Sequence, residues 1–367
     1  MFKRSALFFL LMFSLVLWTS CSSDGDDQPV IEEQGEDITD NNSDDDSNDG
    51  DNDNDDNNDG ETASLATNGC SNVVIFNNYA YAACGGEIEV VSLTTLERNL
   101  LSISADDIAV DTEAGLLFIQ SRNTVQVLTL DNPMEPSIAA TASTNFSIFS
   151  GVAAANGVLV ISGGSGNSDT QVFNYTASSI SLVTDGIAVV DNVTGNPDVH
   201  VTPTPDGITA FYSQDLGNVA NWGIQIVSLN TNAQVTDTPP VVVLTPGQFN
   251  GSFAPFGNAN FPVESEFLNN QLYVAHFAAQ GIEVIDLENN NTLSLISLPY
   301  EPTNIGTDGT SLFVVGITND SVDIIDPSTA TVVDSLGDAL QQATGVAASE
   351  THIAVADRSE GLIIIAR

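Results

Sequence analysis

Four residues far apart in this chain have side chains suited to holding a metal ion: Asp107, His200, Glu264 and Glu266. Carboxylate oxygens are the ligands that a hard cation such as calcium prefers. The sequence predicts a calcium site only if the fold brings these residues to one place. The alternative is that they line a water-filled channel and hold no ion.

Motifs of the common enzyme classes are missing from the sequence. The histidines His200, His276 and His352 have no spacing that suggests zinc, and His352 is most simply a hydrogen-bonded structural residue. There is no Gly-x-Ser-x-Gly elbow, phosphate-binding loop or dinucleotide fingerprint. The sequence therefore favours a protein that binds over one that catalyses.

A second group of residues suits the binding of a sugar or a peptide. Aromatic planes beside Asn and Asp stack on sugar rings or grasp a peptide, and Trp222, the only Trp after residue 21, stands between Asn221 and Gly223. The predicted binding residues are Asp215, Asn221, Trp222, Phe249, Phe253, Phe256, His276 and Phe277. They lie in four long segments, 162–170, 213–223, 244–262 and 275–281. The alternative is that the Phe side chains fold inward and pin these loops.

An internal repeat indicates how these residues are positioned. Seven similar apolar segments recur, at EIEVVSL, TVQVLTL, TQVFNY, GIQIVSL, GIEVIDL, SVDIIDP and GLIIIAR, with successive spacings of 37, 47, 52, 58, 40 and 40 residues. A period of this size is typical of repeat folds. Each unit adds two strands before this segment and one after it, and turn residues such as Asn77-Asn78 and Asp308-Gly309 close the first hairpin. No amphipathic helix is predicted.

These units predict an all-β fold, a seven-bladed β-propeller over residues 62–367. The chain ends after the seventh repeated strand, so we expect residues 62–67, TASLAT, to supply the outer strand of the last blade and close the ring. The first strands should line the central channel, with the four potential metal ligands near the axis. The four long segments should share one face, over blades three to five.

Cys70 and Cys84 flank the first predicted hairpin and should lie opposite each other on its two strands. Cysteines so placed in an exported protein predict a disulfide. The alternative is a thiol pair with a redox function.

The N-terminal 61 residues predict export and anchoring. Residues 1–20 form a signal peptide, with Lys3 and Arg4 before a short apolar run, and the run resembles a bacterial lipoprotein cleavage box whose lipidated residue would be Cys21. Ordinary secretion with a leftover Cys is the alternative. Residues 21–61 form an acidic, disordered tether, whose opening CSSDGDD is similar to the surface-export signal of Bacteroidetes-type lipoproteins.

The charge of the body restricts its partners. Residues 63–367 carry 31 Asp and Glu against four Arg and no Lys, a net charge of −27. Such a surface repels nucleic acid and anionic lipid, so no nucleic-acid partner is expected.

Two stretches carry a family likeness. LFVVGITNDSVDIIDPSTATVVDSL resembles the YVTN-type repeats of surface-layer propellers, and TVQVLTLDNPMEPSIAAT resembles the LVIVD repeats of bacterial surface propellers. The resemblance implies a cell-surface propeller on the outer membrane, but no defined activity. We expect a surface lipoprotein that binds a glycan, a peptide or another surface protein. Propeller lactonases resemble this architecture too, and they leave a metal-dependent hydrolase as the alternative.

Overall fold

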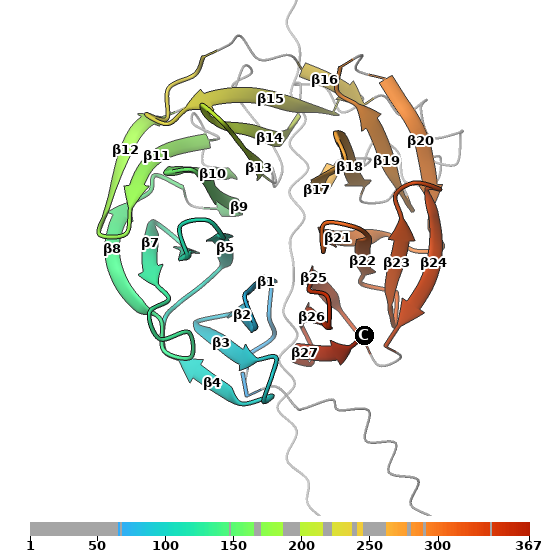
Figure 1. The fold of residues 1–367 in the computed structure, drawn as a ribbon, viewed down its shortest axis with the longest axis horizontal. Coiled ribbons are helices and arrows are strands. Elements are labelled where there is room, and N and C mark those ends of the chain that lie inside the picture. Colours follow the sequence, from blue (N-terminus) through green and yellow to red (C-terminus); the bar gives the residue numbers. More distant parts are fainter. Residues whose placement is uncertain are drawn as a thin grey trace, which may run out of the picture. The chain divides into compact units, whose positions relative to one another are not determined.

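The computed structural model describes residues 65–66, 68–146, 148–164, 170–185, 199–215, 222–236, 241–244, 262–276, 280–288, 291–337 and 340–367. In the unit that spans residues 57–367, seven antiparallel sheets stand around a central axis (Figure 1). Six sheets have four strands and the seventh has three among the described residues. The predicted seven-bladed β-propeller is confirmed.

Each sheet is one blade, and its strands run in chain order from the axis outward. The first strands are β1 (Asn72–Phe76), β5 (Asp107–Asp111), β9 (Ile148–Ala155), β13 (Val199–Thr204), β17 (Pro262–Leu268), β21 (Pro302–Thr307) and β25 (Ala343–Ala348). The second strands are β2 (Tyr79–Cys84), β6 (Leu116–Ser121), β10 (Val158–Gly164), β14 (Gly207–Asp215), β18 (Gln271–His276), β22 (Leu312–Gly316) and β26 (His352–Asp357). The third strands are β3 (Glu87–Ser92), β7 (Thr124–Thr129), β11 (Thr170–Thr176), β15 (Trp222–Asn230), β19 (Gly281–Asp286), β23 (Val322–Asp326) and β27 (Gly361–Ala366). The fourth strands are β4 (Arg98–Leu101), β8 (Ser137–Ser143), β12 (Ser179–Asp185), β16 (Val241–Leu244), β20 (Asn291–Ser297) and β24 (Thr331–Leu336). The seven repeated segments are the third strands, as predicted.

The core lies between the blades. Each interface between neighbouring blades, called a seam here and numbered by its two blades, holds its own cluster of buried apolar side chains. Alternate residues of one strand enter opposite seams. In β6, Leu117 and Ile119 pack into seam 1/2, whereas Phe118 packs into seam 2/3. Because both faces of an inner strand are buried, its sequence is an almost continuous apolar run, and this is why the repeat is visible in the sequence.

Tight turns join the first and second strands of the blades. Asn77, Asn156, Asn269 and Asn270 have φ angles of 53°, 51°, 53° and 61°. Asn tolerates this left-handed region better than most residues, and it therefore closes short hairpins. The turn positions predicted from Asn and Gly are confirmed.

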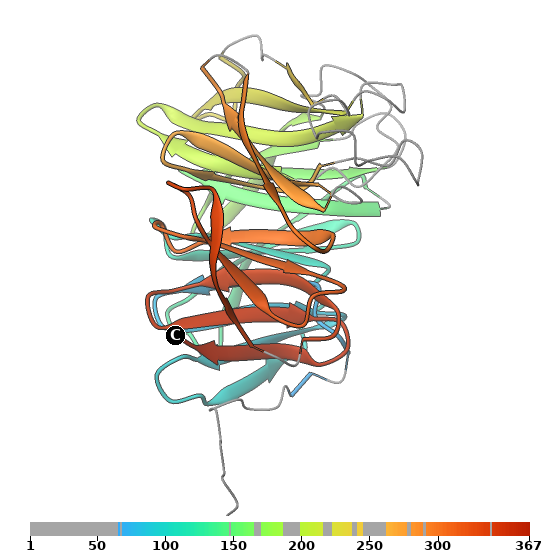
Figure 2. The ribbon, with the colours of Figure 1, turned by 90° about the vertical axis from the view of Figure 1, so that its right-hand side faces the viewer.

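The strands run between two rims of the ring (Figure 2). Because they alternate in direction, one rim carries the turns between first and second strands, and we call it the turn rim. The other carries the connections from second to third strands and from each fourth strand to the next blade, and we call it the connection rim. No helix among the described residues is long and apolar enough to cross a membrane.

The ring is closed at seam 7/1, where β25 contacts β1. The predicted closing segment, residues 62–67, is described only at Leu65 and Ala66, which belong to no strand. The backbone amides of these two residues donate to the Glu89 carboxylate on β3, at 2.8 and 3.2 Å. Closure by an added strand from residues 62–64 lies outside the described residues and stays a prediction.

Candidate functional site

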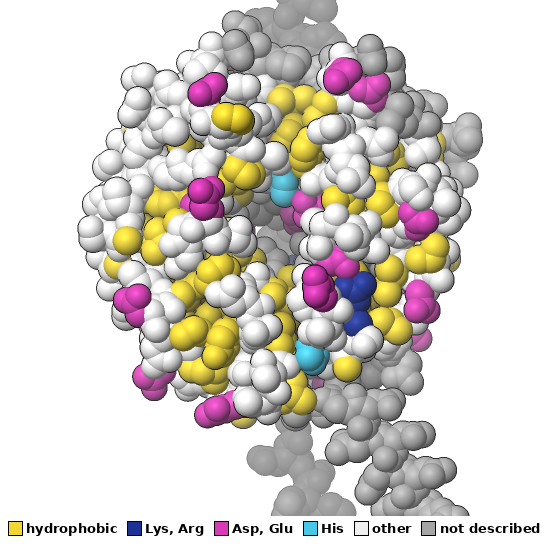
Figure 3. All heavy atoms as spheres, viewed as in Figure 1, with side chains coloured by type: hydrophobic (Ala, Val, Ile, Leu, Met, Phe, Trp, Pro, Cys, Tyr) yellow, Lys and Arg dark blue, Asp and Glu magenta, His cyan; other side chains and the backbone are white. Residues whose placement is uncertain are grey.

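A cavity of ≈ 350 Å³ opens along the axis of the ring and is lined by the first strands of all seven blades. Most of its wall is Val, Ile and Ala, because the inner strands are apolar on both faces. The ionisable side chains on the wall are His200, Glu264 and Glu266. Figure 3 shows a hollow at the centre of the ring, with a histidine and acidic side chains beside it. Three of the four predicted channel residues therefore line the cavity.

His200 and Glu266 face each other across seam 4/5. His200 Nε2 lies 3.6 Å from Glu266 Oε1, within ion-pair range but too far for a hydrogen bond. Burial raises the pKa of the Glu266 carboxyl, although His200 and the amide of Phe267 act to lower it. Phe211 and Phe267, whose stacked rings are 5.6 Å apart, come from the same two blades. The arrangement places one histidine and one carboxyl in a largely apolar wall.

Glu264 is bound to the neighbouring blade. The amide group of Asn304, on the first strand of blade six, donates to Glu264 Oε2 at 2.8 Å. The amide oxygen of Asn304 accepts a hydrogen bond from the backbone of Val346, on blade seven, at 3.0 Å. This buried Asn therefore connects blades five, six and seven around the cavity. Its role was not predicted from the sequence. Asn72 in blade one likewise donates to a carboxylate of a neighbouring blade, that of Asp107.

Asp107 lies on the first strand β5, as predicted, but it is not among the residues that line the cavity. Its carboxylate accepts hydrogen bonds from Asn72 Nδ2 at 2.7 Å and from the Val152 amide at 2.9 Å. The carboxylate therefore bonds to the first strands on both sides and joins blade two to blades one and three. Burial raises the pKa of Asp107 to about 6, against the opposite effect of the hydrogen bonds from Asn72 and Val152.

The four residues do not form a compact ligand set for calcium. Among the described residues, the one group of three potential ligands whose ligand atoms all lie within 4.8 Å of one another is Cys70, Cys84 and Glu89. The two sulfurs there are joined in a disulfide. Glu264 and Asp107 accept hydrogen bonds from Asn side chains, so a cation would have to compete for their oxygens. The channel as it stands fits a hard cation poorly.

The predicted binding loops lie mostly outside the described residues. This holds for Asn221, Phe249, Phe253, Phe256 and Phe277. The backbones of Asp215 and Trp222 are described, and the two residues pair across β14 and β15 at the ends of these strands. The connection between the two strands therefore leaves the sheet directly beside Trp222, on the connection rim.

His276 is not an open surface residue, which corrects its place in the predicted patch. Its side chain is 2% exposed, and its Nε2 lies 3.4 Å from Glu283 Oε2, on the neighbouring strand β19. Both side chains are buried within blade five. His276 is therefore a buried residue at the end of β18, directly before the connection of residues 277–280.

The two longest connections on this rim join blade three to blade four and blade four to blade five. Residues 165–169, 216–221 and 277–280 join second to third strands in blades three, four and five. Residues 186–198 and 245–261 join these blades to one another. The second and third strands are joined by residues 85–86, 122–123, 317–321 and 358–360 in blades one, two, six and seven, so the two connections between blades, 186–198 and 245–261, are the ones set apart by length. The sequence analysis missed the 186–198 connection, whose signal is the long spacing between the third and fourth repeats.

No protein-family model matches this chain, and no curated protein matches it. The fold and the residues on its two rims are therefore the basis for any functional conclusion.

The disulfide between Cys70 and Cys84 is formed. Cys70 lies just before β1, and the register of β1 and β2 places Asn72 opposite Ala83. Cys70 is therefore one residue beyond the position directly across from Cys84, a small correction to the expected pairing. Its backbone is also bound to blade seven, because its amide donates to Asp357 O and its carbonyl accepts from Thr344 Oγ1, each at 3.0 Å. The disulfide braces the closing seam.

Proposed function

We propose that this protein is a non-catalytic, surface-exposed lipoprotein that binds a glycan, a peptide or another protein through the connection rim of blades three to five. The observation that carries the proposal is the distribution of connection lengths. The connections from one blade to the next are residues 186–198 and 245–261 between blades three, four and five, whereas elsewhere they are only residues 102–106, 144–147, 298–301 and 337–342. Long loops on a rigid scaffold are the usual place of binding sites.

Anchoring belongs to the same proposal. Lipidation of Cys21 would fix the chain to the outer membrane, and the acidic tether of residues 21–61 would hold the propeller away from it. A flexible chain of that length has an end-to-end distance of roughly 35 Å. The resemblance to YVTN and LVIVD repeats supports a place at the cell surface, because both occur in bacterial surface propellers.

The rival function is a metal-dependent, lactonase-like hydrolase that uses the channel. One observation favours it: His200, Glu264 and Glu266 line the same axial cavity. The ligand atoms of these three side chains do not all lie within 4.8 Å of one another, and this weighs against a shared metal ion. With the full-length protein, we expect the melting temperature to be the same with calcium and with a chelator. A large loss of melting temperature with chelator, joined to lactone turnover, would establish the hydrolase instead.

Trp222 gives the direct test of the binding face. After the predicted cleavage before Cys21, it is the only Trp, so its fluorescence reports on this rim alone. The test titrates the exported protein with neutral oligosaccharides such as laminarihexaose and cellohexaose, and with trigalacturonate. We expect a saturable fluorescence change with at least one glycan, and at least tenfold weaker binding by calorimetry in Trp222→Ala. Binding that is unchanged in Trp222→Ala would remove the rim of blades three to five from the site.

A further inference from the structure

A second depression lies on the connection rim, where blades seven, one and two meet. Its volume is ≈ 370 Å³, within the range of small-molecule sites, and its walls are residues 69–71, Gly85, Ala105, Asp106 and Arg358. These come from the segment that enters β1, the connection between β2 and β3, the segment that enters β5 and the connection between β26 and β27. The depression therefore shares its rim with the long connections of blades three to five.

Glycine explains why this place is hollow. A Cβ on Gly69 would lie 1.8 Å from the carbonyl oxygen of Arg358, so the two backbones approach more closely than any side chain allows. Gly85 has a φ of +51°, in the left-handed region that glycine tolerates. The walls are thus mainly backbone and small side chains, with Cys70 among them. Among the described residues, no aromatic side chain lines the space.

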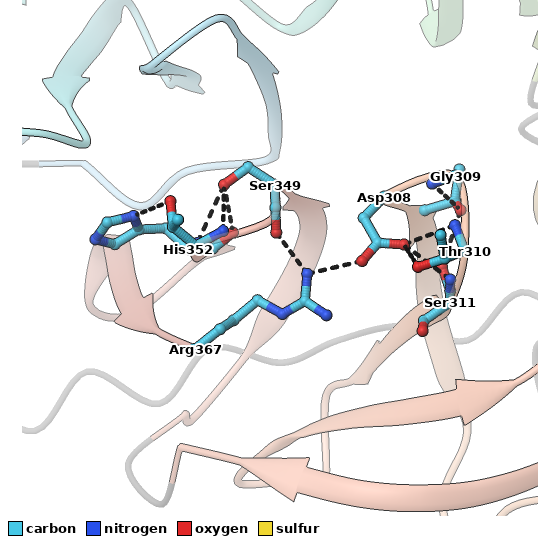
Figure 4. A network of polar contacts seen from close by, with 9 residues as sticks. Asp308, Gly309, Thr310, Ser311, Ser349, His352 and Arg367 are labelled. Atoms are coloured by element: carbon cyan, nitrogen blue, oxygen red, sulfur yellow. Dashed lines mark hydrogen bonds and ion pairs between the residues drawn. The ribbon is translucent and has the colours of Figure 1, made fainter.

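Arg358 has an unusual electrostatic position in this acidic protein. Two of the four arginines are paired: Arg98 with Glu89, and Arg367 with Asp308 (Figure 4). Arg358 is exposed and forms no ion pair with a described carboxylate. Arg358 is one of the residues that line the depression. A guanidinium without an ion pair to a described carboxylate is available for a planar acidic group, which it can hold with two parallel hydrogen bonds.

Asp106 supplies the complementary group on the opposite wall. Its Oδ2 accepts a hydrogen bond from the Arg122 amide at 2.7 Å, and its other carboxylate oxygen accepts none from the described residues. A free carboxylate oxygen accepts from a hydroxyl or an amine. A matching ligand therefore carries both an acidic group and a hydrogen-bond donor.

We propose that this depression is a subsite for a carboxylated sugar, a uronic acid unit, with the carboxylate on Arg358 and a ring hydroxyl on Asp106. The inference deepens the proposed binding function and rests on it, since it names the ligand class of the same rim. A uronic acid fits this pair of groups because it carries a carboxylate and hydroxyl donors on one ring. The net charge of −27 repels long polyanions, but at physiological ionic strength this repulsion is screened over about 8 Å, so short oligomers are the suitable probes.

The experiment compares two arginines and two ligands. Full-length wild type, Arg358→Gln and Arg122→Gln are titrated by calorimetry with trigalacturonate and with its methyl ester, in 0.15 M salt. Arg122 is the matched control, because its side chain is also exposed, forms no ion pair with a described carboxylate and does not line the depression. Its backbone amide, which donates to Asp106, is unchanged by the substitution. We expect Arg358→Gln and methyl esterification each to weaken binding about tenfold or more, and Arg122→Gln to stay within twofold.

Several outcomes overturn the inference. These are equal binding of acid and ester, equal effects of the two Arg substitutions, no binding of trigalacturonate, and tighter binding of an acidic peptide with a free terminal carboxylate.

Trp222→Ala separates this inference from the proposed function. If Trp222→Ala abolishes glycan binding and Arg358→Gln does not, the rim binds glycans and the subsite is wrong. If Arg358→Gln alone abolishes it, the subsite is right and the loops of blades three to five are not the site.

Discussion

The two seams that flank blade seven are held together in different ways. In seam 6/7, Arg367 lies at the turn rim, where its guanidinium binds Asp308 Oδ2 at 2.7 Å and the carbonyl of Ser349 (Figure 4). In seam 7/1, the pair of Arg98 and Glu89, 2.6 Å apart, is buried at 4% and 0% exposure. Arg98 also donates to the carbonyl of Leu362, on β27 of blade seven. The ion pair of seam 6/7 lies at the edge of that seam, and the ion pair of seam 7/1 is buried inside it.

The difference follows from chain order. The segment between β24 and β25 connects blades six and seven covalently, whereas blade one begins the ring and blade seven ends it, so no strand connection crosses seam 7/1. Apolar packing is present in both seams. Seam 7/1 adds the buried ion pair, the amides of Leu65 and Ala66 on Glu89, and the attachment of Cys70 to blade seven. Buried polar contacts take the place of the missing connection.

Removing Glu89 should give the largest effect. Glu89→Ala removes the carboxylate that pairs with the buried Arg98 guanidinium and that accepts from the amides of Leu65 and Ala66. Breaking one side of a buried pair costs about 3–5 kcal/mol, so the free energy of unfolding in urea should fall by that amount. A loss under about 1 kcal/mol would mean that the pair does not hold the seam.

The control for this prediction removes both charges. In Glu89→Ala combined with Arg98→Met, no uncompensated charge stays buried, and an apolar side chain of similar length fills the space. We therefore expect the double variant to be more stable than Glu89→Ala alone. If it is less stable, the loss comes from packing and not from the unpaired guanidinium.

The fold could be predicted from the sequence because each inner strand is apolar on both faces. Repeated segments such as GIEVIDL and SVDIIDP record this burial, and their number gave the number of blades. The turns were visible because Asn and Gly mark positive φ. The polar contacts of seam 7/1 were not predicted, because Glu89 and Arg98 look like ordinary surface charges until the seams are known.

The site was only partly predictable, for reasons of register. A strand alternates its side chains between two faces, and a bulge reverses that alternation beyond it. The pairing of β17 with β18 shifts between Pro262 and Glu264, so the direction of Glu264 could not be read from alternation alone. Asp107 was placed near the axis because it lies on a first strand, but its carboxylate bonds to Asn72 and Val152 on the neighbouring first strands. Arg358 was not predicted as a site residue, because the sequence does not show which carboxylates lie near an arginine and therefore whether it forms an ion pair.

The disulfide should contribute the next largest effect at seam 7/1. It joins residues 14 apart, and a loop of about that size is stabilised by about 3 kcal/mol through the entropy of the unfolded chain. We expect Cys70→Ala combined with Cys84→Ala to lower the free energy of unfolding by about this amount. The loss should add less than fully to that of Glu89→Ala, since both act on one seam. Full additivity would mean that the disulfide stabilises blade one by itself.

Asp308→Asn at seam 6/7 should have the smallest effect, about 1 kcal/mol, because this pair lies at the rim and the chain already connects the two blades.

Burial acts to raise the pKa of Asp308, but hydrogen bonds from Ser311, Thr310 and Arg367 outweigh it and lower the pKa to about 2. A carboxyl whose pKa is lower in the folded state stabilises the fold above its unfolded pKa, near 3.8, and that gain is lost as the pH falls toward 2. The difference in melting temperature between wild type and Asp308→Asn should thus be constant from pH 7 to 5 and shrink between pH 4 and 2. Subtraction of the two curves cancels the titration of the other carboxyls, so a difference that persists unchanged at pH 2 would show that Asp308 acts through its turn hydrogen bonds and not through its charge.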